Sequence, residues 1–194
     1  CIQQRNPTGL AWVYYDAKDG SVLNEQYLPT IEDLGRGTAG DIDPRYKGVE
    51  FWTFTDGIYT PSSDSSISSS HPWPNFKIWW DGDLSAELLN RERISKWVPA
   101  SQSENRLLTA SRYGAVDSWR DAAQFHGDIL GDWREEVIFA HSSQTKIMIF
   151  TTTTPTTERL YTLPHNPGYR ACMTVKGYQQ SHLVDYYLGT EMEA

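Results

Sequence analysis

The chain has 194 residues, of which 39% are hydrophobic and 13% aromatic, so it can bury the core of one or two globular domains. Its net charge of −8 and pI near 5.0 leave no basic patch to neutralise phosphates, which argues against nucleic-acid binding. No apolar run approaches the roughly 18 to 20 residues that span a bilayer, and a start at Cys1 suggests a chain processed or cut from a longer one.

Short strands, taken in chain order, account for most of the sequence. They are rich in aromatic and β-branched residues and are separated by clusters of Gly, Pro, Asp and Asn. The expected strands are 10–17, 49–54, 75–81, 92–98, 135–142, 145–153, 158–163 and 172–178. Residues 85–97 also fit one or two helical turns, although their second half fits a strand better. The sequence therefore predicts a mostly β fold.

Two local features bear on organisation. The Ser/Pro-rich stretch 60–75 is expected to be an exposed loop inserted between strand-rich units. The two cysteines, Cys1 and Cys172, permit one disulfide, one bond to a missing segment, or two free thiols.

An acidic pattern recurs three times along the chain. Asp41, Asp81 and Asp128 lead the three occurrences, and their spacings of about 40 and 47 residues lie in the range of propeller blades. Regular strands, turn signals and this repeat together favour a β-propeller over a sandwich. The chain holds roughly four blade-sized units at best, so we expect it to supply only part of a ring.

The acidic repeats are candidate cation sites, because Ca²⁺ takes about six to eight oxygen ligands from carboxylates, carbonyls and water. The candidate ligands are Asp41, Asp43 and Glu50; Asp81, Asp83 and Glu87; and Asp128, Asp132, Glu135 and Glu136. The alternative is that these residues cap turns and end strands. In that case Trp133 fills the core and Arg134 neutralises nearby carboxylates.

Four blocks carry a resemblance to a known family: GRGTAGDIDPRYKGVEFW, NFKIWWDGDL, GDILGDWREEVI and ERLYTLPHNPGYR. In this order they resemble the C-terminal half of the rhamnogalacturonan lyases of polysaccharide lyase family 11, and with their separations they cover most of residues 9–189. The resemblance implies an all-β, eight-bladed, calcium-loaded β-propeller. Residues 1–194 would be a partial propeller catalytic domain with roughly half of the blades, and the rest would lie on a second polypeptide or a missing part of the same precursor.

The resemblance also implies an activity. The expected protein is a secreted, pectin-degrading polysaccharide lyase that cleaves the rhamnogalacturonan I backbone by β-elimination at galacturonate and leaves an unsaturated uronate. Removing the C5 proton builds negative charge on the galacturonate carboxylate, and calcium or a guanidinium can neutralise that charge.

Two arginines are predicted to act on that carboxylate. Arg36 lies in the Gly-Arg-Gly that matches the family's substrate-binding arginine, and a forked guanidinium suits a carboxylate. Arg120, in the segment DSWR, falls where relatives carry a lysine. Because arginine is a poor proton acceptor near neutral pH, Arg120 is expected to clamp the carboxylate or sugar.

The proton acceptor is predicted to be Tyr178, which falls near an active-site tyrosine of the family, ahead of His126 and His182. The two histidines are also candidates for substrate binding. Trp119 and Tyr113 are candidates for stacking on sugar faces, and either can equally belong to the core.

Two rival interpretations stay open at this point. The first is a calcium-dependent propeller that binds carbohydrate without cutting it, and the altered segment DSWR supports it. The second is a structural adhesive propeller that binds no pectin.

Overall fold

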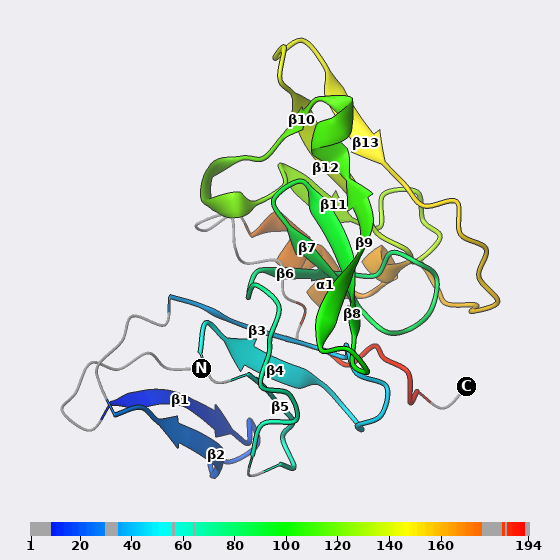
Figure 1. The fold of residues 1–194 in the computed structure, drawn as a ribbon. Helices are drawn as coiled ribbons and strands as arrows, with labels where there is room; N and C mark the ends of the chain where they lie inside the picture. The colour runs from blue at the N-terminus through cyan, green and yellow to red at the C-terminus, as the bar shows by residue number, and fades with distance from the viewer. Residues whose placement is uncertain are drawn as a thin grey trace.

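The structure is a computed structural model that describes residues 9–29, 35–55, 57–63, 65–175, 184 and 186–192. Within these ranges the chain forms four antiparallel sheets and one short α-helix. The sheets follow one another in chain order, from the β1–β2 pair at the lower left to the β10–β13 sheet at the top (Figure 1). The prediction of a mostly β fold is confirmed.

The first three sheets are simple meanders. The two-stranded sheet pairs β1 (Leu10–Tyr15) with β2 (Val22–Tyr27). The three-stranded sheet has the order β3 (Gly37–Gly40), β4 (Glu50–Thr53), β5 (Ile58–Tyr59). The four-stranded sheet has the order β6 (Phe76–Ile78), β7 (Glu87–Asn90), β8 (Arg93–Val98), β9 (Ser103–Thr109).

The last sheet is centred on β12 (Glu136–His141), which pairs with three strands. These are β10 (Ala115–Val116), β11 (Phe125–Gly127) and β13 (Ile147–Phe150). Short helical segments complete the fold: η1 (Ala110–Tyr113), η2 (Trp119–Asp121), η3 (Leu163–His165) and α1 (Pro167–Thr174). No helix in the ranges described has the length and apolar character of a membrane span.

Two predicted strands are wrong. Residues 158–162 have no regular structure and Leu163 begins η3. Residues 172–174 belong to α1, which begins after Asn166. The Asn166 side chain accepts from the backbone N–H groups of Gly168 and Tyr169, and Pro167 occupies the first helical position, so this helix start is well capped.

Residues 85–97 contain the hairpin β7–β8, not helical turns. Asn90 pairs with Arg93 across the turn, and Arg91 takes a φ of +55° within it. The Ser/Pro-rich stretch 60–75 mixes exposed serines with buried points: Ser68 is buried and bridges Ile58.

The core consists of apolar layers between successive sheets. One cluster joins β4, β7, β8 and α1 through Trp52, Leu88, Trp97 and Tyr169, and another joins β6–β8 to β10 and β12. A third packs Trp12 of β1 against β4 and β5. Burying each large side chain stabilises the fold by about 1.5–3 kcal/mol, so these layers hold consecutive sheets face to face.

Three of the sheets share one layout. A strand (β3, β6 or β11) runs into an acidic turn, and the next strand (β4, β7 or β12) begins at a glutamate: Glu50, Glu87 or Glu136. These glutamates are almost fully buried. The predicted repeat therefore corresponds to a repeated strand–turn–strand unit.

Candidate functional site

Arg36 lies just before β3, between two glycines. Gly35 has a φ of +62°, and a Cβ at this position would lie 2.9 Å from the Phe54 ring, so the backbone path requires glycine. The Arg36 guanidinium donates to Asn75 Oδ1 at 2.6 Å. Its Cζ lies 5.9 Å from the centroid of the Phe54 ring, which contacts the half-exposed Trp73 edge-on. Arg36 is thus held on one side by an amide and on another by an aromatic ring.

Arg120 lies in a strained turn. Arg120 and Asp121 have φ values of +66° and +60°, two consecutive non-glycine residues in the left-handed region. Such conformations cost about 1–3 kcal/mol each and persist only where the surroundings hold them. The carbonyl oxygen of Asp121 accepts from Asn75 Nδ2 at 2.8 Å and from the backbone N–H of Arg91 at 3.0 Å.

Asn75 joins the two arginine-bearing segments. It is buried just before β6, and its side chain contacts Arg36, the Asp121 carbonyl and Asn90 Oδ1, the last at 3.0 Å. Its own carbonyl oxygen accepts from the Thr38 hydroxyl at 2.7 Å. One side chain therefore connects β3, the end of β7 and η2.

The charges around Arg36 leave it cationic. Burial lowers the pKa of Arg36, the nearby Asp121 carboxylate opposes this shift, and Arg120 adds to it. Arginine stays protonated despite such a shift. The structure thus brings Arg36 and Arg120 close enough for their charges to interact. The half-buried, fork-shaped guanidinium of Arg36 can donate hydrogen bonds to a bound carboxylate.

The other residues predicted for catalysis or substrate binding lie in different settings. Tyr178 and His182 lie outside the described residues. Trp119 begins η2, next to Arg120. Tyr113 is 64% exposed at the end of η1, with its ring 5.8 Å from that of Phe150. His126 is buried on β11 with its ring 5.2 Å from that of Phe76, so binding a sugar would require a surface that it does not present here.

The three repeated glutamates hold the acidic turns through backbone hydrogen bonds. Glu50 Oε2 accepts from the N–H groups of Ile42 and Asp43, both at 2.9 Å. In the same way Glu87 accepts from Trp80 and Asp81, and Glu136 from Ile129 and Leu130. Each carboxylate satisfies two adjacent turn amides that would otherwise be left without a partner.

These contacts correct the alignment of the repeat. In each turn, the first amide that donates to the glutamate follows directly after Asp41, Trp79 or Asp128. Asp81 is therefore not the structural equivalent of Asp41 and Asp128. Successive turns are also bonded to each other. Ala86 N donates to Asp41 O at 2.7 Å, and Glu135 N donates to Trp79 O at 2.8 Å.

The Asp128 set is saturated by hydrogen bonds. Asp128 Oδ1 accepts from the backbone N–H groups of Gly131 and Asp132, and Oδ2 from the N–H groups of Trp133 and Leu163 and the Thr162 hydroxyl. Arg134 pairs with Asp132. These contacts are those of the capping alternative, with Trp133 buried in the core.

Glu135 and Glu136 are likewise bonded. Glu135 Oε1 accepts from the Tyr169 hydroxyl at 2.6 Å and its Oε2 from Trp79 N at 3.0 Å. Glu136 Oε1 accepts from the Thr151 hydroxyl at 3.0 Å. Burial raises the pKa of Glu135 to about 7, although its hydrogen bonds and Lys77 oppose the shift.

Asp81, Asp83 and Glu87 form an acidic cluster that could hold a metal ion, with carboxylate oxygens within 4.8 Å of one another. Lys96 Nζ, on β8, already bonds all three, at 2.7, 2.6 and 2.9 Å respectively. Burial disfavours the ammonium, but the carboxylates outweigh burial and raise the pKa of Lys96. The position of a cation in this cluster is therefore filled by a side chain.

Asp41 and Glu50 differ from the other acidic residues. Asp41 Oδ1 and Glu50 Oε1 are buried side-chain oxygens without a hydrogen-bond partner in this part of the chain. Burial raises the pKa of Glu50 to about 8, and Asp41 and Asp43 contribute to this shift. Asp43 itself is paired with Arg45. Of the three predicted sets, this one has buried carboxylate oxygens left for a cation, so the fit to Ca²⁺ is best here.

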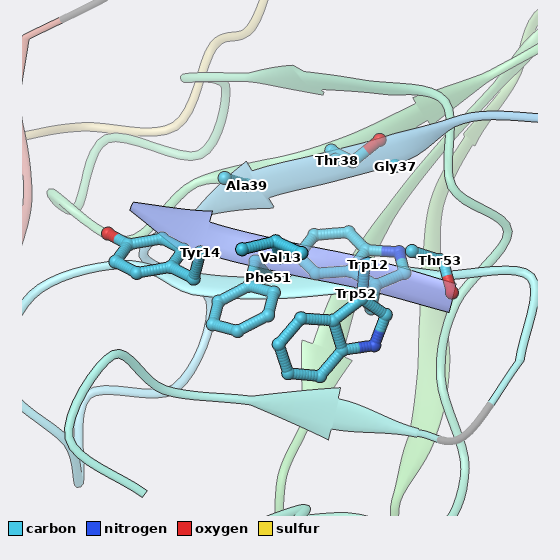
Figure 2. Close-up of a pocket in the computed structure, with 9 residues that line it drawn as sticks. All are labelled: Trp12, Val13, Tyr14, Gly37, Thr38, Ala39, Phe51, Trp52 and Thr53. Carbon is cyan, nitrogen blue, oxygen red and sulfur yellow. The ribbon is translucent and has the colours of Figure 1, made fainter. Parts of the chain in front are cut away.

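A cavity of about 180 Å³ lies between β1, β3 and β4. Figure 2 shows that Trp12, Tyr14, Phe51 and Trp52 form its aromatic wall beneath Thr38 and Ala39. No charged side chain lines it. It is a gap in the packing between two sheets and is poorly suited to a charged sugar.

Three residues of the site were not predicted. Asn75 has no sequence signal, because its partners lie at positions 36, 90 and 121. Lys96 lies between Ser95 and Trp97 in a predicted strand, and nothing in the sequence distinguishes it from a solvent-facing lysine. Tyr169 lies in the segment Asn-Pro-Gly-Tyr-Arg. An asparagine followed by a proline is a signal for the start of a helix, and it could have placed Tyr169 on one.

Comparison with known proteins gives consistent matches. The family described as rhamnogalacturonan lyase family 11, C-terminal domain, matches residues 2–194. The rhamnogalacturonan endolyase YesW of Bacillus subtilis (strain 168) is 40% identical over 182 residues, covering 92% of this chain and 29% of that protein. The rhamnogalacturonan exolyase YesX of the same organism is 32% identical over 196 residues, covering 92% of this chain and 32% of that protein.

Solved structures agree with these sequence matches. The rhamnogalacturonan lyase PL11 of Bacillus licheniformis superposes with a TM-score of 0.84 at 39% identity, covering 93% of this chain and 31% of that one. The chain therefore spans about a third of the length of the relatives that it matches.

Proposed function

Because the chain belongs to rhamnogalacturonan lyase family 11, as its C-terminal domain, we propose that it supplies part of the active site of a pectin-degrading lyase. The reaction is β-elimination at a galacturonate of the rhamnogalacturonan I backbone, with an unsaturated uronate as product. The observation that carries this proposal is the convergence of Arg36 and the Arg120–Asp121 turn on Asn75.

The arginines act on the galacturonate carboxylate. As the C5 proton leaves, charge grows on this carboxylate, and preorganised donors facing it stabilise the transition state. The Arg36 guanidinium is half-buried and donates to the amide oxygen of Asn75. Because this amide is neutral, the bond does not cancel the charge of Arg36. Arg120 binds and orients the sugar, because a guanidinium offers only hydrogen-bond donors and is a poor proton acceptor.

The proton acceptor is proposed to be Tyr178. A tyrosine can accept a proton where nearby positive charge favours the phenolate. The electrons of the C5–H bond then form the C4–C5 double bond, and the C4–O bond breaks with the oxygen leaving on the departing chain. His182 is the second candidate acceptor.

The proposed architecture is an eight-bladed β-propeller, of which this chain contributes only a part. Three repeated strand–turn–strand units, bonded turn to turn, support a propeller. The chain spans about a third of the length of its relatives, which supports less than the half of the blades expected from the sequence. The remaining blades, on a second polypeptide or elsewhere in the same precursor, are the proposed partner. The substrate is a pectic polysaccharide, and we propose that the protein is secreted.

Calcium is proposed as a bound ion at Asp41 and Glu50, whose buried free oxygens support it. When bound there it would supply positive charge between two buried carboxylates and stabilise the turn after β3. The sets at Asp81 and Asp128 do not fit an ion in the same way, since Lys96 and backbone N–H groups already occupy their oxygens. A propeller that binds sugar without cutting it is not favoured, because both matched relatives are named lyases.

The test is elimination by the intact natural protein on rhamnogalacturonan I, followed by the ultraviolet absorbance of the unsaturated uronate. We expect the absorbance to rise with wild type and to stay near baseline with Arg36→Ala at an unchanged melting temperature. Wild-type protein that binds the polysaccharide without raising the absorbance would support the binding-only alternative.

A further inference from the structure

We propose that Asn75 is a positioning residue, which sets Arg36 and the Arg120–Asp121 turn in one fixed geometry around the galacturonate carboxylate. This inference rests on the proposed function and adds to it a residue that touches neither substrate nor proton. Its basis is the set of hydrogen bonds made by a single buried amide.

Every donor of the Asn75 side chain is used. Oδ1 accepts from Arg36 Nη1 at 2.6 Å, while the two N–H groups of Nδ2 point to Asp121 O at 2.8 Å and Asn90 Oδ1 at 3.0 Å. A flipped amide would set N–H groups against the guanidinium and an oxygen against two oxygens. The hydrogen-bond network therefore fixes a single orientation.

The contacts span distant parts of the chain. Arg36 precedes β3, Asn90 ends β7, and Asp121 ends η2. One amide therefore links three segments that are far apart in the sequence. The main chain of Asn75 is tied as well, through Thr38. Because the side chain is 5% exposed, water cannot readily replace any partner that is removed.

The turn that Asn75 holds is one that needs support. Arg120 and Asp121 both have left-handed φ values, a conformation that neighbouring contacts must maintain. Two hydrogen bonds to the Asp121 carbonyl, from Asn75 and from the Arg91 backbone, supply that support. Losing the Asn75 bond leaves the Asp121 carbonyl with the Arg91 bond alone and so weakens the support of the turn that carries Arg120.

The neutrality of the amide matters for the chemistry. A carboxylate at this position would accept from Arg36 equally well but would pair with it, and so compete with the substrate carboxylate for the same cation. An amide oxygen orients the guanidinium and leaves its charge for the transition state. An amide is also the group that can donate twice on its other side.

The experiment measures kcat, KM and melting temperature for the intact natural protein with Asn75→Ala, Asn75→Asp, Asn90→Ala and Arg36→Ala. A misplacement of about 1 Å can cost about 10²-fold, so we expect Asn75→Ala to lower kcat by about 10- to 100-fold with KM within about threefold. Asn75→Asp, which is the same size, should lower kcat at least as far. Asn90→Ala removes one partner of Asn75 Nδ2 but leaves the Asn75 bonds to Arg36 and to the Asp121 carbonyl, so it should lower kcat less than Asn75→Ala does.

The outcomes separate this inference from the proposed function. If Arg36→Ala is inactive but Asn75→Ala and Asn75→Asp keep wild-type kcat, the proposed function stands and the positioning role is wrong. The positioning role is also wrong if kcat falls in both Asn75→Ala and Asn90→Ala in proportion to the fall in their melting temperatures. If Arg36→Ala retains full elimination activity, the proposed function fails and this inference fails with it.

Discussion

Replacement of Lys96 by methionine tests whether a side chain supplies the cation of the second acidic turn. The Lys96 ammonium contacts three carboxylates at 2.9 Å or less, and one of them, Glu87, is 0% exposed. Removing one partner of a buried ion pair costs about 3–5 kcal/mol. Since Asp81 and Asp83 are 22% and 57% exposed, water and protonation relieve part of this, and we expect about 3 kcal/mol.

The assay is thermal unfolding of the intact natural protein near neutral pH in the presence of a chelator. Each kcal/mol shifts the melting temperature of a unit of about 150–250 residues by about 2–4 °C, and that of a larger unit by less, so Lys96→Met should melt up to about 6–12 °C lower. The control is Lys47→Met, since Lys47 is exposed, and it should change the melting temperature by about 1–2 °C at most.

Calcium gives a second readout for the same variant. With the ammonium gone, three carboxylates face one another, so calcium should bind there and recover part of the lost melting temperature. Lys96 does not supply this cation if, in chelator, Lys96→Met melts at the wild-type temperature or loses no more melting temperature than Lys47→Met does.

Three further predictions concern the arginines, the buried carboxylates and calcium. Arg120→Ala should lower kcat by about 10²- to 10³-fold with an unchanged melting temperature, and Arg120→Lys should lose less; wild-type elimination rates in both would make Arg120 a bystander. Burial raises the pKa of Glu50 to about 8, so the folded state keeps a proton that the unfolded chain releases. Without calcium, the free energy of unfolding should therefore fall by on the order of a few kcal/mol as pH rises from about 4 to about 8. Glu50→Gln should make the melting temperature depend less on pH. An unchanged dependence would argue against a protonated Glu50 in the folded state. Chelation should lower the wild-type melting temperature near pH 8 but not that of Glu50→Gln, and equal responses would argue against an ion at Asp41 and Glu50.

Strands were predictable where aromatic and β-branched residues alternate or run together. The segments around Trp52, Phe76 and Val137 form strands for that reason. Residues 158–163 contain only one aromatic and one β-branched residue and form no strand, and Leu163 instead begins η3, where its N–H is bonded to Asp128. Composition reports a preference, and here a distant carboxylate decides the local conformation.

The repeat was predictable in outline but not in alignment. Sequence spacing groups Asp81 with Asp41 and Asp128, whereas the hydrogen bonds group Trp79 with them. The residue that defines the unit is the glutamate that begins the second strand, followed each time by two apolar residues. That pattern is visible in the sequence at Glu50, Glu87 and Glu136.

The candidate site was predictable in its charges and not in its connections. Arg36 was suggested by the glycines around it, and the structure places a ring 2.9 Å from where a Cβ on Gly35 would be. Asn75 was not suggested, because its role follows from contacts that close loops of about 15 to 46 residues. The sequence could not rank the three acidic sets as cation sites, because it does not show that backbone N–H groups bond the Asp128 oxygens or that Lys96 bonds the Asp81 set.

The most direct test of the central claim compares wild type with Arg36→Ala in one elimination assay on rhamnogalacturonan I, with both proteins folded to the same melting temperature. We expect wild type to produce the ultraviolet absorbance of an unsaturated uronate and Arg36→Ala to lower kcat by about 10²-fold or more, with a smaller change in KM. Equal rates for the two proteins, or no unsaturated product from wild type that binds the polysaccharide, would contradict it.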